Sequence, residues 1–467
     1  MSIFRNLFGV FSRSGRKRKT RTRKTGAAQF LPAGEVSATA VAKVVVAHLL
    51  GSGGDDAADR VAAMLGNDTR LEVLRRPEAL KQPGGSSLLE RLTGAAENGR
   101  RWLDEEQADI LVWGEMEDLG TIQCFRFLPR QAPPSGQVIG FALGDTLQLP
   151  DDAASFYDDL MAAAVYGALA PVHKGMRGPV LEALKGRLAP VQGWADKLPD
   201  EVPAEHRGSI LVTLGNAMAA AALIGGGEKL LGRAALAFQN AGALVDQGDD
   251  PLAWAMTQNH LGAVLETQGR KNKDPDPLIE AAARYRGVAD ALGRDAYPMD
   301  WGLAHVRLGS VLYRLANVDL KNITPHLKDA GSAFEEALTV YSKEIMPGRW
   351  AEVMNQYGVV LMALGDQLSG TATLEQAISG FKKTLEVRKR EHVPLMWAQT
   401  ANNLGAASFS LAKRDAKREQ ELLRDAAGCF EGAIEVFSQT PGYGKRAQVI
   451  ANNLSRVEKM LQRQQAG

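Results

Sequence analysis

Apolar positions in the C-terminal half of the chain recur with a long and nearly constant period. Four segments begin with Pro-x-x-Trp and carry Gly eight residues after the Trp; they start at Pro251, Pro298, Pro347 and Pro394. A second pattern, Leu-x-x-Ala-x-x-x-aromatic, keeps the same phase and ends at Phe238, Tyr285, Phe334, Phe381 and Phe430. All of these spacings are 47 or 49 residues. Two patterns in one phase predict a stack of two-helix units, each burying its apolar face on its neighbours.

Residue types within each unit predict two closely packed helices. Trp254, Leu261 and Leu265 fall on one helical stripe, and a preceding proline suits the first helical turn. Gly262 lies in the same stripe, although glycine costs about 1 kcal/mol relative to alanine inside a helix. Its return in every unit indicates close approach of the second helix, which carries small residues such as Ala281. The repeated tryptophans are expected to be largely buried at equivalent sites between repeats: Trp254, Trp301, Trp350 and Trp397.

These units resemble tetratricopeptide repeats over residues 207–464. The residues that carry the resemblance are Leu261-Gly262, Ala281, Tyr285 and Val288, then Leu308-Gly309, Ala330, Phe334 and Ala337, with two further matches. The family period is normally 34 residues, so the longer period here predicts insertions between helices, at 269–276, 317–325, 366–373 and 413–420. The segment 446–462 is expected to be a polar helix that caps the array.

Strand and helix signals alternate in residues 38–170, which predicts a small mixed α/β domain. Strands are expected at 42–50, 71–74, 109–115, 121–128 and 137–149, and helices at 55–65, 87–107 and 153–169. The strand 108–115 leading into 125–128 resembles the amino-terminal domain of Tol translocation protein B and its relatives, which implies an assembly or adaptor role. Residues 171–206 hold five prolines and are expected to form a helical connector. The whole chain is thus expected to be α+β, an α/β domain followed by an all-α solenoid.

Charge is distributed unevenly, although the net charge is only +1. Of the 55 basic residues, nine lie in residues 1–26, which contain no acid; this leaves 46 basic against 54 acidic residues in the remainder. Apolar side chains precede the basic run on one helical face, a pattern typical of an interfacial membrane anchor. Two other readings of residues 1–37 stay open: a disordered basic tail without a single partner, and, less favoured, a nucleic-acid arm. The residues assigned to an anionic surface are Phe4, Leu7, Phe8, Phe11, Arg16, Lys17, Arg18 and Lys19.

Catalytic and metal-binding patterns are weak in this sequence. The seven histidines do not pair at ligand spacing, and Cys124 and Cys429 fit core positions, so no metal or cofactor is expected. Gly51-Ser-Gly-Gly54 follows a strand and opens a helix as a phosphate loop would, but the acids after it favour a helix cap. No nucleophile with a matching base is recognisable. The sequence therefore predicts a protein that is not an enzyme.

A binding groove is expected along the first helices of the repeats, because these line the concave face in the tetratricopeptide family. In some members an Asn two residues before the Leu-Gly position holds a peptide. Four of the five matching positions are Asn here, and they either contact a partner or hold the stack together. The expected groove residues are Asn259, Glu266, Tyr313, Asn355, Met362, Asn402, Phe409 and Asn452.

These observations predict a bacterial cytoplasmic adaptor or scaffold that binds a protein partner through its repeats and lies peripherally on the inner membrane face. The alternative is a regulatory protein whose α/β domain binds a small molecule or nucleotide. A third and less favoured class is an enzyme whose site lies in residues 38–170.

Overall fold

The computed structural model describes residues 41–84, 88–117, 121–132, 139–151, 155–170 and 176–465. The segment 1–37, with its expected membrane-binding residues, lies outside these ranges. Contacts between elements divide the described chain into two compact units, one ending at Leu292 and one beginning at Gly293. The first unit therefore combines the α/β region with the first helix pairs, whereas the sequence suggested a boundary near residues 171–206.

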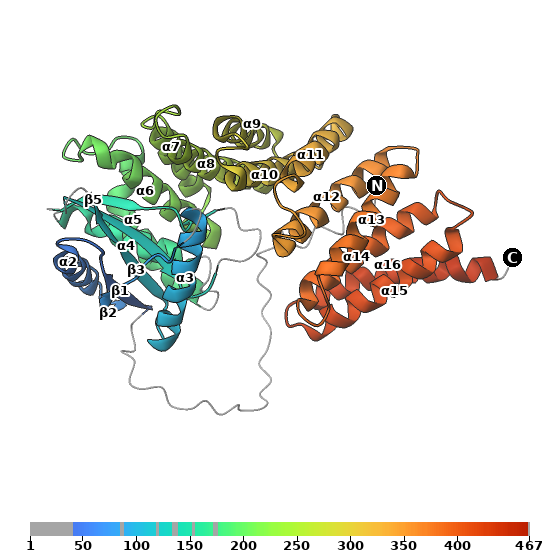
Figure 1. The fold of residues 1–467 in the computed structure, drawn as a ribbon, viewed down its shortest axis with the longest axis horizontal. Helices are drawn as coiled ribbons and strands as arrows, with labels where there is room; N and C mark the ends of the chain where they lie inside the picture. Colours follow the sequence, from blue (N-terminus) through green and yellow to red (C-terminus); the bar gives the residue numbers. More distant parts are fainter. Residues whose placement is uncertain are drawn as a thin grey trace, which may run out of the picture. The chain divides into compact units, whose positions relative to one another are not determined.

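A five-stranded mixed sheet forms the N-terminal part of the first unit (Figure 1). Its strands lie in the order β2-β1-β3-β4-β5. The strands are β1 (Ala42–His48), β2 (Leu71–Ala79), β3 (Ile110–Glu117), β4 (Ile122–Pro129) and β5 (Leu147–Pro150). β1 pairs in parallel with β2 and β3, and β4 pairs antiparallel with β3 and β5. This arrangement confirms the predicted mixed α/β domain, although β2 is longer and β5 shorter than expected.

Both faces of the sheet are covered by helices, which explains why its central strands are almost continuously apolar. Helix α3 (Leu88–Glu105) packs on one face, where Gly99 meets the side chains of Leu111 and Leu128. Helices α2 (Gly54–Gly66) and α4 (Asp158–Leu169) also contact strands of the sheet. Helix α4 packs in addition against the first helices that follow it in the chain.

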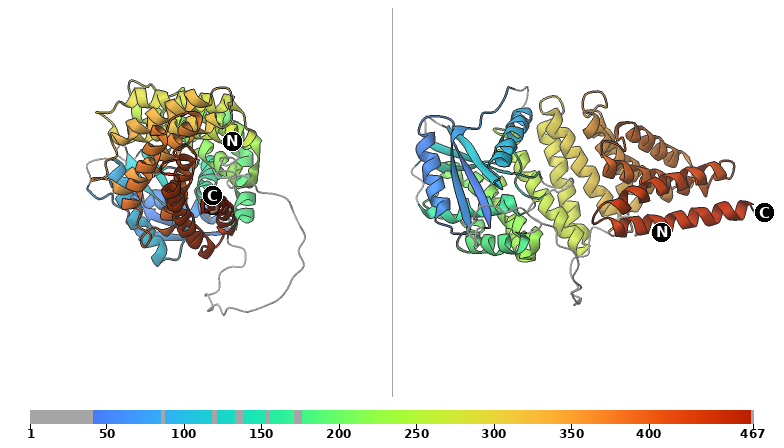
Figure 2. Two further views of the ribbon diagram at one scale, coloured as in Figure 1. Left: turned by 90° about the vertical axis from the view of Figure 1, so that its right-hand side faces the viewer. Right: turned by 90° about the horizontal axis from the view of Figure 1, so that it is seen from below.

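The helices described in residues 176–465 form five antiparallel pairs and a terminal helix, with a connecting helix α5 (Arg177–Val191) before them. The pairs are α6 (Arg207–Ala221) with α7 (Glu228–Gly242), α8 (Pro251–Asn272) with α9 (Pro275–Leu292), α10 (Pro298–Ala316) with α11 (Ile323–Leu338), α12 (Pro347–Gln367) with α13 (Ala372–Val387), and α14 (Pro394–Ala412) with α15 (Glu419–Gln439). The terminal helix α16 (Gly444–Gln465) packs on α15. The described residues also contain short helical turns, which are η3 (Ser155–Tyr157), η5 (Gln192–Ala195), η6 (Ala204–His206) and η7 (Ala222–Gly226). Figure 2 shows the C-terminal helices, coloured orange to red, packed one after another in chain order, and the predicted helical repeat array is confirmed.

The repeated glycine is required by the aromatic ring of the second helix. A Cβ built on Gly358 would lie 2.6 Å from Cε1 of Phe381, and one on Gly262 would lie 2.7 Å from the ring of Tyr285. Real Cβ atoms do not approach other atoms so closely, so only glycine lets the ring cross the first helix at this distance. The sequence predicts this close approach, but its small alanines, such as Ala281, had suggested a different reason for it. The same contact recurs at the glycines of the other pairs: Gly215 with Phe238, Gly309 with Phe334, and Gly405 with Phe430.

The long period is accommodated partly by the expected insertions and partly by longer helices. Residues 317–322 and 413–418 lie between paired helices, as expected, whereas the first expected insertion does not form. Most of the expected insertion 269–276 is helical, because α8 continues to Asn272 and α9 begins at Pro275. The connections that remain between paired helices are short. The repeats are therefore extended along the helix axes, which enlarges the surface that each helix offers.

One helical stretch in the described residues, 204–226, is long and apolar enough to cross a membrane by length and composition alone. Most of it is buried in the structure, where α6 packs against α4, α5, α7 and β5. Its apolar composition is accounted for by this central position in the first unit.

Candidate partner-binding surface

The glycine loop after β1 is a helix cap in the structure. Gly53 adopts the left-handed backbone conformation at φ 78° and precedes α2. Asp55 at the start of that helix accepts hydrogen bonds from Arg75 at 2.5 Å and lies 3.2 Å from Nδ1 of His48. The His48 contact and Arg75 together lower the pKa of the Asp55 carboxyl. Carboxylates and their partners thus occupy the position that a phosphate would need.

Asp68 joins the α2–β2 turn to α4 and α5. Its carboxylate is 4% exposed and accepts hydrogen bonds from Arg70, from the Tyr166 hydroxyl at 3.0 Å and from Arg187 at 3.1 Å. Burial opposes ionisation of this carboxyl, but the hydrogen bonds outweigh it and lower its pKa to about 2. Burial and the neighbouring carboxylate raise the pKa of Tyr166. All of these donors are used within the protein, so the cluster serves to hold three elements together.

Asp145 holds the segment before β5 against two helices of the repeat array. His260 of α8 lies 2.8 Å from one carboxylate oxygen, and Asn216 of α6 donates to the other at 2.9 Å. The His260 ring is stacked on Phe238 of α7, with ring centroids 5.2 Å apart. Among the described residues, no hydrogen bond brings a Ser, Thr or Cys side chain to Asp145 or His260. The described residues also contain no group of three or more His, Cys, Asp or Glu arranged to hold a metal ion.

The expected groove residues differ widely in exposure. Asn452 is exposed, whereas Asn259, Tyr313 and Asn355 are half-buried. Glu266, Met362, Asn402 and Phe409 are buried between neighbouring helices. Burial also raises the pKa of the Tyr313 hydroxyl to about 12. The four buried residues cannot offer side chains to a partner in this arrangement, so of these eight residues a partner could contact the other four.

Asn355 takes part in a hydrogen-bond ladder between repeats. Its Oδ1 accepts from the Thr400 hydroxyl at 3.0 Å and from the amide of Asn403 at 3.4 Å. Asn403 in turn accepts from Asn402, and the buried Arg388 donates to Thr400 at 3.0 Å. These bonds join α12 to α14 and to the turn before α14. The ladder supports the reading in which the asparagines of these two repeats hold the stack together.

The repeated tryptophans are not equally buried, contrary to the sequence expectation. Trp350 is 8% exposed, whereas Trp254, Trp301 and Trp397 are half-buried. A basic residue seven positions before the Trp lies over the indole ring in three repeats: Arg294 over Trp301, Lys343 over Trp350 and Arg390 over Trp397. The same basic residues reach the second helix of their repeat, where Lys343 pairs with Glu386 and Arg390 with Glu435. This regular spacing was visible in the sequence and was missed.

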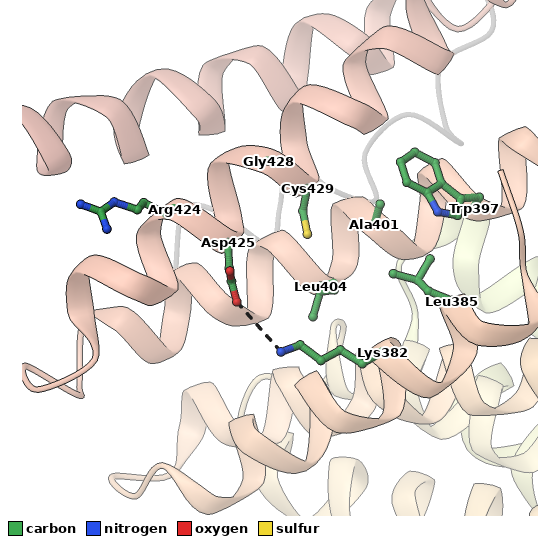
Figure 3. Close-up of a pocket in the computed structure, with 9 residues that line it drawn as sticks. All are labelled: Lys382, Leu385, Trp397, Ala401, Leu404, Arg424, Asp425, Gly428 and Cys429. Carbon is green, nitrogen blue, oxygen red and sulfur yellow. Dashed lines mark ion pairs between the residues drawn. The ribbon is translucent and has the colours of Figure 1, made fainter.

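A pocket of about 440 Å³ opens between α13, α14 and α15 (Figure 3). Trp397 and Leu385 lie at one end, and Leu404 and Cys429 lie near its middle. At the other end Lys382 of α13 faces Asp425 of α15, with their charged atoms 4.0 Å apart. The remaining lining residues are Ala401, Arg424 and Gly428. A mainly apolar hollow with a few polar groups at its edge is a common form of binding site.

Comparisons with known proteins give only distant structural likenesses. No family model matches the chain, and no curated protein matches it. One similar solved structure is a circular tandem repeat protein with novel repeat topology and enhanced subunit contact surfaces. It is 14% identical, has a TM-score of 0.32, and the match covers 66% of this chain and 85% of that one. Another comes from the computational design of self-assembling cyclic protein homooligomers, at 10% identity, a TM-score of 0.13, and coverage of 65% and 92%.

At these TM-scores, neither likeness indicates what the chain binds. The tetratricopeptide and Tol translocation protein B resemblances remain predictions, while the structure itself shows the helical repeat array.

Proposed function

We propose that the protein is a non-enzymatic adaptor whose helical repeats bind a partner protein. The observation that carries this proposal is the pocket between α13, α14 and α15, a mainly apolar hollow in an array whose repeated leucines and aromatic rings are largely buried on neighbouring helices. Helical arrays of this type offer extended surfaces and commonly serve as protein-binding scaffolds. The polar clusters at Asp68 and Asp145 are occupied by internal hydrogen bonds, which fits an α/β region that supports the array.

Cross-linking during affinity purification tests this function. The full-length protein is purified from its native cell after chemical cross-linking, and cross-linked peptides are located by mass spectrometry. We expect partner cross-links to fall on residues 251–465. Cross-links confined to residues 41–170 would contradict the proposal. A set of metabolites or nucleotides that raises the melting temperature, without any partner protein, would favour the ligand-sensing alternative.

We further propose that residues 1–26 attach the protein to an anionic membrane surface. Each basic residue near such a surface contributes about 1 kcal/mol, and this part weakens with salt. Insertion of Phe4, Leu7, Phe8 and Phe11 would add a part that does not depend on salt.

Liposome flotation separates these two contributions. The intact protein should float with anionic vesicles, and deletion of residues 1–26 should abolish binding. Changing Phe8 and Phe11 to Ser should leave only a weak, salt-sensitive remainder. Equal flotation of the deletion variant would rule out the anchor, as would a preference of the intact protein for duplex DNA at physiological salt.

A further inference from the structure

The pocket exists because two side chains of α14 are smaller than their counterparts one repeat earlier. Ala401 and Leu404 stand where α12 has Met354 and Tyr357, four and seven residues after the tryptophan in each case. The sulfur of Met354 lies only 3.3 Å from a Cβ built on Gly380 of α13. The Tyr357 hydroxyl donates a hydrogen bond to Glu335 of α11. These larger side chains occupy the space between α11 and α13, whereas the space between α13 and α15 stays open.

Trp397 shows the consequence of the smaller neighbours. Trp350, beside Met354 and Tyr357, is 8% exposed, but Trp397 is half-buried and lines the pocket. Its ring packs against α15, since a Cβ added to Gly432 would lie 2.8 Å from Cη2, and the Arg390 guanidinium lies 5.3 Å from the ring centre. The result is a fixed aromatic wall, which an apolar side chain from outside can contact without reordering the site.

One ion pair lies in the pocket lining and another lies beside Trp397. Arg390 pairs with Glu435 at 2.7 Å near Trp397, and Lys382 pairs with Asp425 at the other end. Arg424, which is exposed at the rim beside Asp425, forms no ion pair with any described residue. Residues 372–467 as a whole contain 15 basic and 10 acidic residues. A segment that docks here is therefore favoured if it is acidic, and the basic residues 1–26 have the wrong sign.

We propose that an acidic amphipathic segment of the partner protein binds in this pocket; this proposal rests on the proposed adaptor function. An apolar side chain of the segment fills the space above Leu404 and Ala401 against Trp397. A carboxylate of the same segment pairs with Arg424. The parallel course of α13 and α15 on either side of α14 suits a helical segment whose anchors recur every three to four residues.

Selection from a peptide library provides the test. Random peptides about four helical turns long are displayed on phage and selected on the full-length protein. Selected peptides are then synthesised and their binding is measured by fluorescence anisotropy. We expect the enriched sequences to combine bulky apolar residues at helical spacing with a net negative charge. Enrichment of basic sequences, or no enrichment at all, would overturn the proposal.

Three variants locate the binding site. The triple variant Ala401→Met, Leu404→Tyr and Cys429→Gly installs the residues of the preceding junction, and should weaken binding of the selected peptides about thirtyfold or more. Arg424→Glu changes only an exposed side chain and should weaken binding about fivefold. Lys459→Glu, on the exposed side of α16, makes the same change in net charge and should leave binding unaltered. Equal binding by the wild type and the triple variant would place the peptides elsewhere and contradict the inference.

Cys429 gives an independent readout in the unmodified protein. The chain has two cysteines; Cys124 is fully buried, while Cys429 is half-buried and lines the pocket. A thiol reagent should therefore label Cys429 first, although burial raises its pKa to about 11 and slows the reaction. A bound peptide should protect it, and unchanged labelling at saturating peptide would exclude the pocket. If the partner found by cross-linking binds the triple variant normally, the pocket inference fails while the adaptor function stands.

Discussion

Different kinds of interaction stabilise the interior of each of the two compact units. In the first unit, individual polar clusters join segments far apart in the sequence: Asp68 bonds to Arg187, and Asp145 to His260. In the second unit, the same contacts return in each repeat: a cation over a tryptophan, and a glycine against an aromatic ring, which the two helix pairs of the first unit also have. Loss of one contact should therefore act differently in the two units. The effect of removing a periodic contact can be compared with the effect of the equivalent substitution in another repeat. A polar cluster that occurs once has no equivalent site for such a comparison.

The largest expected effect comes from removing a buried repeat tryptophan. Trp350→Ala should destabilise the second unit by about 3 to 5 kcal/mol, because it leaves a cavity among well-packed helices. Trp397→Ala should cost clearly less, because Trp397 is half-buried and lines a pocket. Urea unfolding followed by circular dichroism compares the two variants. Equal losses would show that the two junctions are packed alike, and an unchanged curve for Trp350→Ala would contradict the repeat packing itself.

The second expected effect is that the same Gly→Ala substitution destabilises the fold at one position and stabilises it at another. Gly358→Ala should destabilise by about 2 kcal/mol, because the added methyl group would meet the Phe381 ring. Gly428→Ala in α15 has open space around its Cβ and should stabilise by about 0.5 to 1 kcal/mol through helix propensity. Thermal melts of the two variants measure this contrast. Stabilisation by both changes would mean that the ring contact does not require glycine.

The same contrast explains which features could be predicted from the sequence. The period, the helix pairs and the need for glycine were recognisable, because periodic burial imposes a periodic choice of residues. The mixed sheet followed from apolar runs separated by helical segments. Pairing of Asp68 with Arg187, or of Asp145 with His260, could not be recognised, because long-range polar contacts leave no local pattern.

The pocket was missed for a related reason. It depends on two residues being smaller than their counterparts in the preceding repeat, Ala401 for Met354 and Leu404 for Tyr357. A repeat pattern consists of the residues that the units share, so residues that differ between units are not part of it. The expected groove residues were chosen by family resemblance, and four of them are buried because these first helices are packed between neighbours on several sides.

The third prediction concerns the pH dependence of the first unit. The folded pKa of Asp68, about 2, lies below its ordinary value of 3.8, so the carboxylate stabilises the fold above pH 3.8. This stabilisation is lost as the pH falls through about 2. Asp68→Asn should therefore reduce stability by about 2 kcal/mol at pH 5 and by progressively less at lower pH. Urea unfolding of both proteins across this range measures the difference, and a gap that does not change with pH would argue against ionisation of Asp68 as its source.

The smallest expected effect belongs to the charged contacts between the turns and the second helices. Arg390 and Glu435 are both partly exposed, so their pair is screened by water and salt. A double-mutant cycle with Arg390→Ala and Glu435→Ala should give a coupling energy below about 1 kcal/mol, decreasing as salt is added. Arg390→Ala alone should cost more than Glu435→Ala, because it also removes the cation from the Trp397 ring. Equal costs for the two single changes would show that the indole contact adds nothing. A coupling well above this range would instead place these pairs with the buried polar clusters of the first unit.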